Sequence, residues 1–205
     1  SYAREQKTNG LGSFVPGVSL SDENYINSWW WGFGACPSPA LGLAEMTASE
    51  VATYVDNLEV HGNTYHDIGM IWGGRLISPT GMFAPEGDDV AAQSSRHMIF
   101  LTDGETAPYD ISYTSYGIEP IDRRRWKPDS SLTLTETVEA RFSFACEEVK
   151  RRNVTVWVIS FGTDANPVMQ SCAGQGRYFV ADDASQLQAA FSDIAARLGE
   201  LRIVN

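Results

Sequence analysis

An apolar stretch of the sequence ends in two carboxylates in HMIFLTDGE, residues 97–105. The continuous apolar run from Met98 to Leu101 is typical of a short strand covered on both faces. Asp103 follows at the carboxyl end of this strand, and ligands bind outside the carboxyl ends of strands in open α/β sheets. Asp103 is therefore a candidate ligand-binding residue by position. A plain Asp-Gly turn is the alternative, because both residues favour turn conformations.

Hydrophobic periodicity predicts the elements that position this stretch. Thr47 and Glu50 have the spacing of a capping box, and the apolar residues that follow at helical spacing predict a helix over 47–58. A second helix ends before Pro79 and presents one apolar face, formed by Ile68, Ile71, Trp72 and Leu76. Both helices precede the strand that carries Asp103.

The second half of the sequence alternates helices with apolar strands. A helix that starts at about Ser131 is marked by Val138, Phe142, Cys146 and Val149. Strands are expected over 154–161 and 178–181, and a closing helix over 182–198. This alternation predicts an α/β layered fold with a mainly parallel sheet.

Two stretches lack periodicity. Residues 1–28 are polar and read as irregular, and residues 104–130 read as a long insertion or surface loop. WWWGFG, residues 29–34, has the composition of a strand. Its tryptophans, Trp29–Trp31, either pack in a core or form a binding patch for protein or glycan.

Composition and charge restrict the function classes. The 205 residues, 43% hydrophobic and 20% charged, fit one large globular domain or one domain with a long insertion. The net charge of −11 repels phosphate backbones, so we expect no nucleic-acid binding. No apolar run approaches the ~20 residues that span a bilayer. Ser1 is not a natural start, so we expect a fragment whose targeting signals lie elsewhere.

A second oxygen ligand stands at another helix start, Thr64 in HGNTYHDIG. Thr64 and Asp103 together resemble the metal-ion-dependent adhesion site of the von Willebrand factor A domain, which takes a threonine and an aspartate from separate loops. A third loop of that site has the pattern D-x-S-x-S. No proper D-x-S-x-S occurs here; GVSLS, residues 17–21, has the serines, but Gly17 stands where the aspartate belongs. The chain therefore carries half of such a site at most.

The resemblance extends over residues 36–203. GNTYHDIGMIWGGRLISPTGMF, HMIFLTDGET, VTVWVISFGT, SCAG and YFVADDASQLQAAFSDIAARL follow in the order seen in TadG-like bacterial tight-adherence (Flp-type) pilus assembly proteins. These are exported, membrane-anchored proteins of the periplasm or cell surface. The resemblance implies a doubly wound, Rossmann-like sheet flanked by helices that lacks its first strand here. Residues 36–205 would form the C-terminal part of the domain, and residues 1–35 an irregular N-terminal segment.

What the resemblance implies for function is a non-catalytic adhesion or assembly domain that binds a protein partner. Thr64 and Asp103 would hold a divalent cation, magnesium or calcium, with Asp103 acting through water. Gly104 and Glu105 would shape the rim. The membrane anchor would lie outside these residues.

Two further expectations follow from the resemblance. An exported parent protein meets an oxidising compartment, so Cys146 and Cys172 are expected to form a disulfide, which leaves Cys36 free or paired elsewhere. The missing first strand would expose the edge of the strand over residues 97–102, an aggregation hazard. We hypothesise that residues 29–33 or a second copy of the chain covers this edge.

Other chemistry stays open as alternatives. A metal-dependent hydrolase of similar layering would use the same carboxylates, and a structural module would retain only a degenerate metal site. No zinc motif is formed by His61, His66 and His97, either alone or with Asp67. We instead expect His66 and Asp67 to lie in the first turn of a helix, where a carboxylate interacts favourably with the helix dipole. No nucleophile motif such as G-x-S-x-G occurs, so we expect no catalysis.

Overall fold

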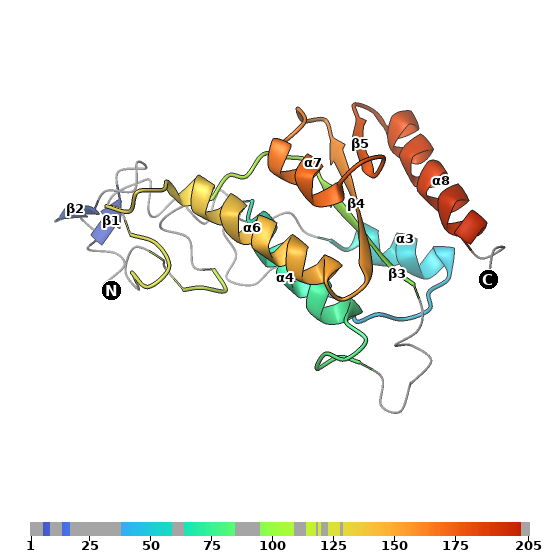
Figure 1. The fold of residues 1–205 in the computed structure, drawn as a ribbon, viewed down its shortest axis with the longest axis horizontal. Helices are drawn as coiled ribbons and strands as arrows, with labels where there is room; N and C mark the ends of the chain where they lie inside the picture. The colour runs from blue at the N-terminus through green and yellow to red at the C-terminus, as the bar shows by residue number, and fades with distance from the viewer. Residues whose placement is uncertain are drawn as a thin grey trace. The chain divides into compact units, whose positions relative to one another are not determined.

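The chain forms two units, and Figure 1 labels its helices and strands. Unit 1 comprises Ser1–Tyr65 and Ala107–Val138, and unit 2 comprises His66–Thr106 and Glu139–Asn205. The structure, a computed structural model, describes a subset of residues. These are residues 6–8, 14–16, 38–58, 64–84, 95–108, 114–117, 119, 123–127 and 129–201.

Unit 2 is built on a three-stranded parallel sheet. Its strands are β3 (Arg96–Thr102), β4 (Val154–Phe161) and β5 (Tyr178–Ala181), in the order β3-β4-β5. The register pairs Thr102 with Ser160 at the carboxyl ends of β3 and β4. The expected α/β fold with a parallel sheet is thus confirmed, and it is consistent with Rossmann-like layering.

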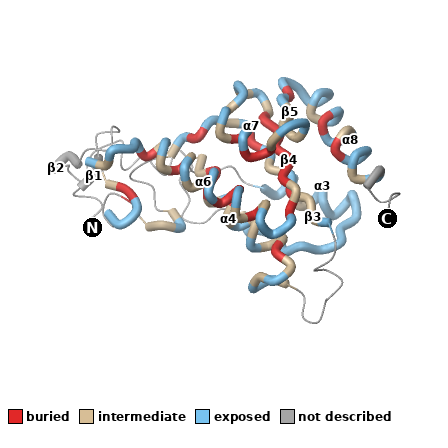
Figure 2. Tube along the Cα trace, viewed as in Figure 1, coloured by how far each residue is buried: buried red, intermediate tan, exposed pale blue. Residues whose placement is uncertain are grey.

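Helices cover both faces of this sheet. One face packs against α4 (His66–Ile77), α6 (Leu134–Lys150) and α7 (Pro167–Ala173), and the other against α8 (Ala184–Leu201). β4 is the most buried strand (Figure 2) because both of its faces are covered. Its side chains alternate between the two cores, with Val154, Val156 and Val158 on the α6 side and Trp157 and Ile159 on the α8 side.

Two glycines let α4 approach its neighbours closely. A Cβ atom on Gly74 would lie 2.6 Å from Cγ2 of Val149, and one on Gly73 would lie 3.1 Å from the terminal methyl group of Met98. Real Cβ atoms do not come as close as the first of these distances. The expected apolar face is only part of the packing surface of this helix. Met70 was not among the residues expected on that face, yet its side chain is fully buried against the sheet.

Unit 1 contains less regular structure. A short antiparallel pair joins β1 (Gln6–Thr8) to β2 (Phe14–Pro16), so these six residues are not irregular as expected. The other residues of 1–28 lie outside the described residues. Helix α3 (Ala48–Asp56) begins at the expected capping box of Thr47 and Glu50. Its apolar residues Val51 and Val55 are nonetheless exposed, and so is Leu58 just after the helix.

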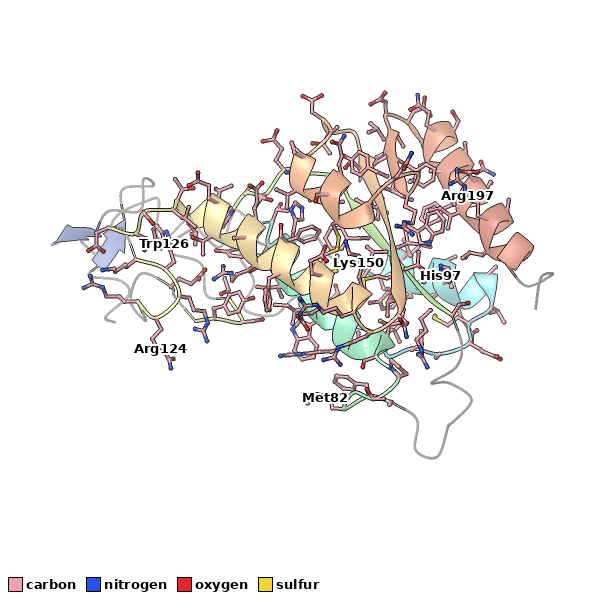
Figure 3. All side chains as sticks on the ribbon, viewed as in Figure 1. Met82, His97, Arg124, Trp126, Lys150 and Arg197 are labelled. Carbon is pink, nitrogen blue, oxygen red and sulfur yellow. A yellow bond between two sulfur atoms is a disulfide. The ribbon has the colours of Figure 1, made fainter. Side chains whose placement is uncertain are left out.

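The loop expected over residues 104–130 contributes a small core to unit 1. Trp126 is buried against Leu134 and Val138, with Tyr65 packed beside them. The indole Nε1 of Trp126 donates a hydrogen bond to the carbonyl oxygen of Leu132 over 3.0 Å. Trp126, labelled in Figure 3, thereby fixes the chain just before α6.

Strand β3 is one of the two outer strands of the sheet among the described residues. Ile99 and Leu101 point away from the α4 side and are 38% and 48% exposed. Residues 29–33, the segment hypothesised to cover this edge, lie outside the described residues. The hypothesis that another segment or copy covers the edge stays a prediction.

Candidate functional site

Asp103 lies where expected, at the carboxyl end of β3. Its side chain is exposed, as is that of Glu105, and Gly104 between them is half-buried. Thr102 closes the turn, because its Oγ1 accepts a hydrogen bond from the backbone N–H of Gly104 over 3.3 Å. The loop is thus a turn closed by a hydroxyl group, and the role of Asp103 as a ligand-binding residue stays a prediction.

His66, the first residue of α4, binds both ends of the Asp103 loop. Its Nε2 lies 2.9 Å from Oγ1 of Thr102, and its Nδ1 lies 2.9 Å from Oγ1 of Thr106. All three side chains are buried. The imidazole therefore spans the loop from the residue before Asp103 to the third residue after it.

The hydroxyl of Thr102 determines which nitrogen of His66 carries the proton. Thr102 Oγ1 lies 3.2 Å from the carbonyl oxygen of Gly104, to which it can donate. If it does, Nε2–H of His66 donates to Thr102, and Nδ1 accepts from the hydroxyl of Thr106. This neutral tautomer satisfies every polar atom of the group.

Burial keeps the His66 imidazole neutral. Desolvation lowers the pKa of His66 to about 4, and the nearby Asp103 carboxylate opposes this shift by raising it. The ring also meets Phe100 and Phe142 edge to face, with centroid distances of 5.8 and 6.2 Å. The side chain is thus a fixed, uncharged link between α4 and the loop.

The residue after His66 anchors the start of α4 to α6. Asp67 is fully buried, and its Oδ2 accepts a hydrogen bond from Nε of Arg141 over 2.7 Å. Its other oxygen, Oδ1, accepts from the backbone N–H of Ile68 over 2.9 Å, which satisfies one of the free N–H groups of the first turn. Both His66 and Asp67 therefore lie in the first turn of the helix, as expected.

Thr64 lies just before α4 and belongs to unit 1. Its backbone pairs with Ala107 through two N–H to carbonyl hydrogen bonds of 3.2 Å each. Asp103 belongs to unit 2. The prediction that the oxygens of Thr64 and Asp103 share one ion stays a prediction.

A shallow acidic recess of about 490 Å³ lies at the carboxyl ends of the strands. One wall comes from the loop after β3 and the others from the loops after β4 and β5. Its lining residues are Glu105, Gly162, Thr163, Asp164 and Asp182. Sequence reasoning identified Glu105 but missed Asp164 and Asp182. The available signal was that Asp182 follows directly on the strand predicted over 178–181, and that Asp164 comes three residues after the end of the strand predicted over 154–161.

Three arginines of unit 2 lie at the opposite ends of the strands. Arg96 begins β3, Arg152 precedes β4 and Arg177 precedes β5. Lys150, near the end of α6, and Arg197, on α8, are labelled in Figure 3. Three carboxylates and no basic side chain line the recess, so its potential is negative and favours cationic groups.

Metal ligands of the zinc type do not gather in the described part of the chain, where no group of three His, Cys, Asp or Glu side chains could hold an ion. His97 is the second residue of β3, and its Nδ1 accepts a hydrogen bond from Nε1 of Trp157 over 3.2 Å. His66 contacts the last residue of the same strand. These two histidines therefore cannot share a metal, and His61 lies outside the described residues.

The two cysteines expected to pair do so in the structure. Cys146 of α6 and Cys172 of α7 form a disulfide with a Cα–Cα distance of 5.9 Å, and both are buried in the main core of unit 2. The bond joins two helices on the same face of the sheet. Among the described residues, no helix is both long and apolar enough to span a membrane.

Comparison with known families, with characterised proteins and with solved structures gives no match to this chain. Functional argument therefore starts from the geometry of unit 2. Its distinctive feature is an exposed aspartate on a loop that a buried histidine holds at both ends.

Proposed function

We propose that unit 2 is a non-catalytic adhesion or assembly domain that binds a protein partner at the carboxyl ends of β3, β4 and β5. The observation that carries this proposal is the loop of Asp103, an exposed carboxylate whose flanking residues, Thr102 and Thr106, are fixed by His66. A fixed, exposed ligand group at this edge of a parallel sheet is placed to meet a partner rather than to stabilise the fold.

The architecture supports a domain of the von Willebrand factor A type, as in TadG-like pilus assembly proteins. Three parallel strands with helices on both faces are what the C-terminal part of such a doubly wound domain would contribute. The Cys146–Cys172 disulfide is compatible with an exported protein of the periplasm or cell surface.

The oxygen donors present suit a hard cation such as Mg²⁺ or Ca²⁺. Asp103 would supply a carboxylate and Thr64 a hydroxyl, which is fewer than the six oxygens that Mg²⁺ requires. Water and a carboxylate of the partner would complete the coordination. The ion would thus link the two proteins, and the chain alone would bind it weakly.

Calorimetric titration with Mg²⁺ and Ca²⁺ tests the role of the cation. We expect millimolar affinity for the unmodified chain, and loss of binding in Asp103→Asn and Thr64→Ala. Asp56→Asn is the matched control, because Asp56 is an exposed carboxylate of α3 in unit 1. Absence of binding to the unmodified chain would instead indicate a structural module, and hydrolysis of an ester or phosphoester would contradict a non-catalytic domain.

A further inference from the structure

We propose that His66 is a positioning residue, which holds the Asp103 loop in the conformation that binds the partner. The inference rests on the proposed function, since it assigns a role to a side chain that would itself touch neither ion nor partner. It starts from the two hydrogen bonds of 2.9 Å that join the imidazole to Thr102 and Thr106.

The loop would be mobile without this link. Residues 103–105 are exposed or half-buried, and Gly104 adds the backbone freedom of a residue without a side chain. Thr106 is the first buried residue after Asp103, and its hydroxyl bonds to the His66 ring. The imidazole thus closes a short loop whose ends are both buried.

The ring can act as a fixed reference because its own position is constrained from several sides. Phe100 and Phe142 contact it edge to face from β3 and α6. The next residue, Asp67, ties the first turn of α4 to Arg141 of α6. The loop is therefore held relative to the helical layer of unit 2 as well as to its own strand.

The functional consequence is preorganisation. A loop that is already in its bound conformation loses less conformational freedom when a ligand binds, so the affinity is higher. Residues that orient ligand groups without touching the ligand typically change affinity by about tenfold to a hundredfold. We expect an effect near the lower end of this range, because His66 acts on the loop ends and not on Asp103 directly.

Thr106→Val tests the inference without emptying the histidine site. It keeps the shape of the side chain and removes only the hydroxyl that bonds to Nδ1 of His66. Thr106→Ser restores the hydroxyl, and His66→Gln provides a second variant in which one amide replaces two ring nitrogens. His97→Gln is the matched control, since His97 lies at the other end of β3.

Amide hydrogen exchange of residues 103–106 is the first readout. In Thr106→Val and His66→Gln, we expect amide exchange to be about tenfold faster in this loop and unchanged in β4. In Thr106→Ser and His97→Gln, we expect the loop to exchange at the rate of the unmodified chain. A loss of protection shared equally by β4 would show a merely structural role and overturn the inference, as would unchanged exchange in the loop.

The affinity for Mg²⁺, measured by calorimetry, is the second readout. We expect binding to Thr106→Val to be about tenfold weaker and binding to Thr106→Ser to be unchanged. If the unmodified chain binds no Mg²⁺, the cation part of the proposed function fails, and hydrogen exchange still decides the role of His66. If Mg²⁺ binds equally to all variants, the inference fails while the proposed function stands.

Discussion

Arg141 donates a hydrogen bond from Nε to Oδ2 of Asp67 over 2.7 Å, and the Asp67 side chain is completely buried. Loss of one partner of a buried ion pair leaves an uncompensated charge and costs about 3–5 kcal/mol. The Arg141 side chain is 20% exposed, so the cost should be at the lower end of this range. We predict that Arg141→Met lowers the free energy of unfolding by about 3 kcal/mol, measured by urea denaturation.

An exposed pair at the C-terminal end of the same helix provides the control. Arg151 and Glu148 form a salt bridge whose side chains are 72% and 38% exposed, and such surface pairs contribute about 0–1 kcal/mol. Arg151→Met should therefore change stability little. The double variant Asp67→Asn with Arg141→Met should be more stable than Arg141→Met alone, because it leaves no unpaired charge. Equal effects of the two arginine substitutions would contradict a special role for the buried pair.

His66 makes stability depend on pH. Burial lowers its pKa to about 4 from the ordinary value of 6.5, so the unfolded state takes up the proton first as the pH falls. The stability contribution is complete above pH 6.5 and is lost as the pH falls towards 4. A full shift of this size corresponds to about 3 kcal/mol, at 1.36 kcal/mol per unit.

Urea unfolding midpoints measured between pH 7 and 4.5 report this loss of stability with least interference from carboxyl groups. Carboxyl groups with lowered pKa, such as Glu50 and Glu136, cause further losses only as the pH falls below about their ordinary value of 4.5. The slope between pH 6.5 and 4.5 should be much smaller in His66→Gln. The His97→Gln variant should retain most of the slope, because His97 is less buried. A slope that is the same in both variants would assign the pH dependence to other groups.

Several elements could be predicted because their signals are local. The strands expected over 154–161 and 178–181 have these bounds in the structure, since runs of apolar β-branched and aromatic residues between polar turns leave little choice. Thr133 and Glu136 form a capping box that starts α6 at Leu134, close to the expected start near Ser131. Helix α7 was not predicted, because a helix of seven residues shows little hydrophobic periodicity. The signals that indicate its start are Asn166 as the N-cap and Pro167 as the first helical residue.

The candidate site could be predicted only in part. The position of Asp103 follows from the end of a strand, which sequence patterns indicate. The contacts of His66 with Thr102 and Thr106 join residues 36 and 40 positions apart. Such pairs depend on how α4 packs against β3, which includes the close approach at Gly74, and no local pattern encodes this packing. Hydrophobic periodicity likewise predicts that α3 has an apolar side, but it does not indicate whether other residues pack against that side.

Reduction of the Cys146–Cys172 disulfide should destabilise the protein. The bond closes a loop with a sequence separation of 26, for which chain entropy gives about 3 kcal/mol. We predict a lower urea midpoint in dithiothreitol, and a similar midpoint without reductant in the double variant Cys146→Ser with Cys172→Ser. Cys36→Ser should retain the full response to reductant. A count of three free thiols in unreduced, unfolded protein would contradict the disulfide.

The outer edge of β3 provides the last prediction. Strand β3 pairs with β4 on one side only among the described residues, and Ile99 and Leu101 are exposed on the face opposite α4. An uncovered edge with apolar side chains would favour aggregation. We therefore predict that this edge is covered in solution, and that the amides of residues 97–102 which point away from β4 exchange slowly.

Dilution then identifies what covers the edge. A second copy of the chain would be indicated if the protection of these amides from exchange decreases on dilution and light scattering shows a concentration-dependent dimer. Protection that is independent of concentration and lost after Trp30→Ala would indicate the segment around residues 29–33. Leu101→Lys should weaken either contact, whereas Phe144→Lys, at a 69% exposed position on α6, should not. Fast exchange of the outward amides at every concentration would show an open edge and remove the hypothesis.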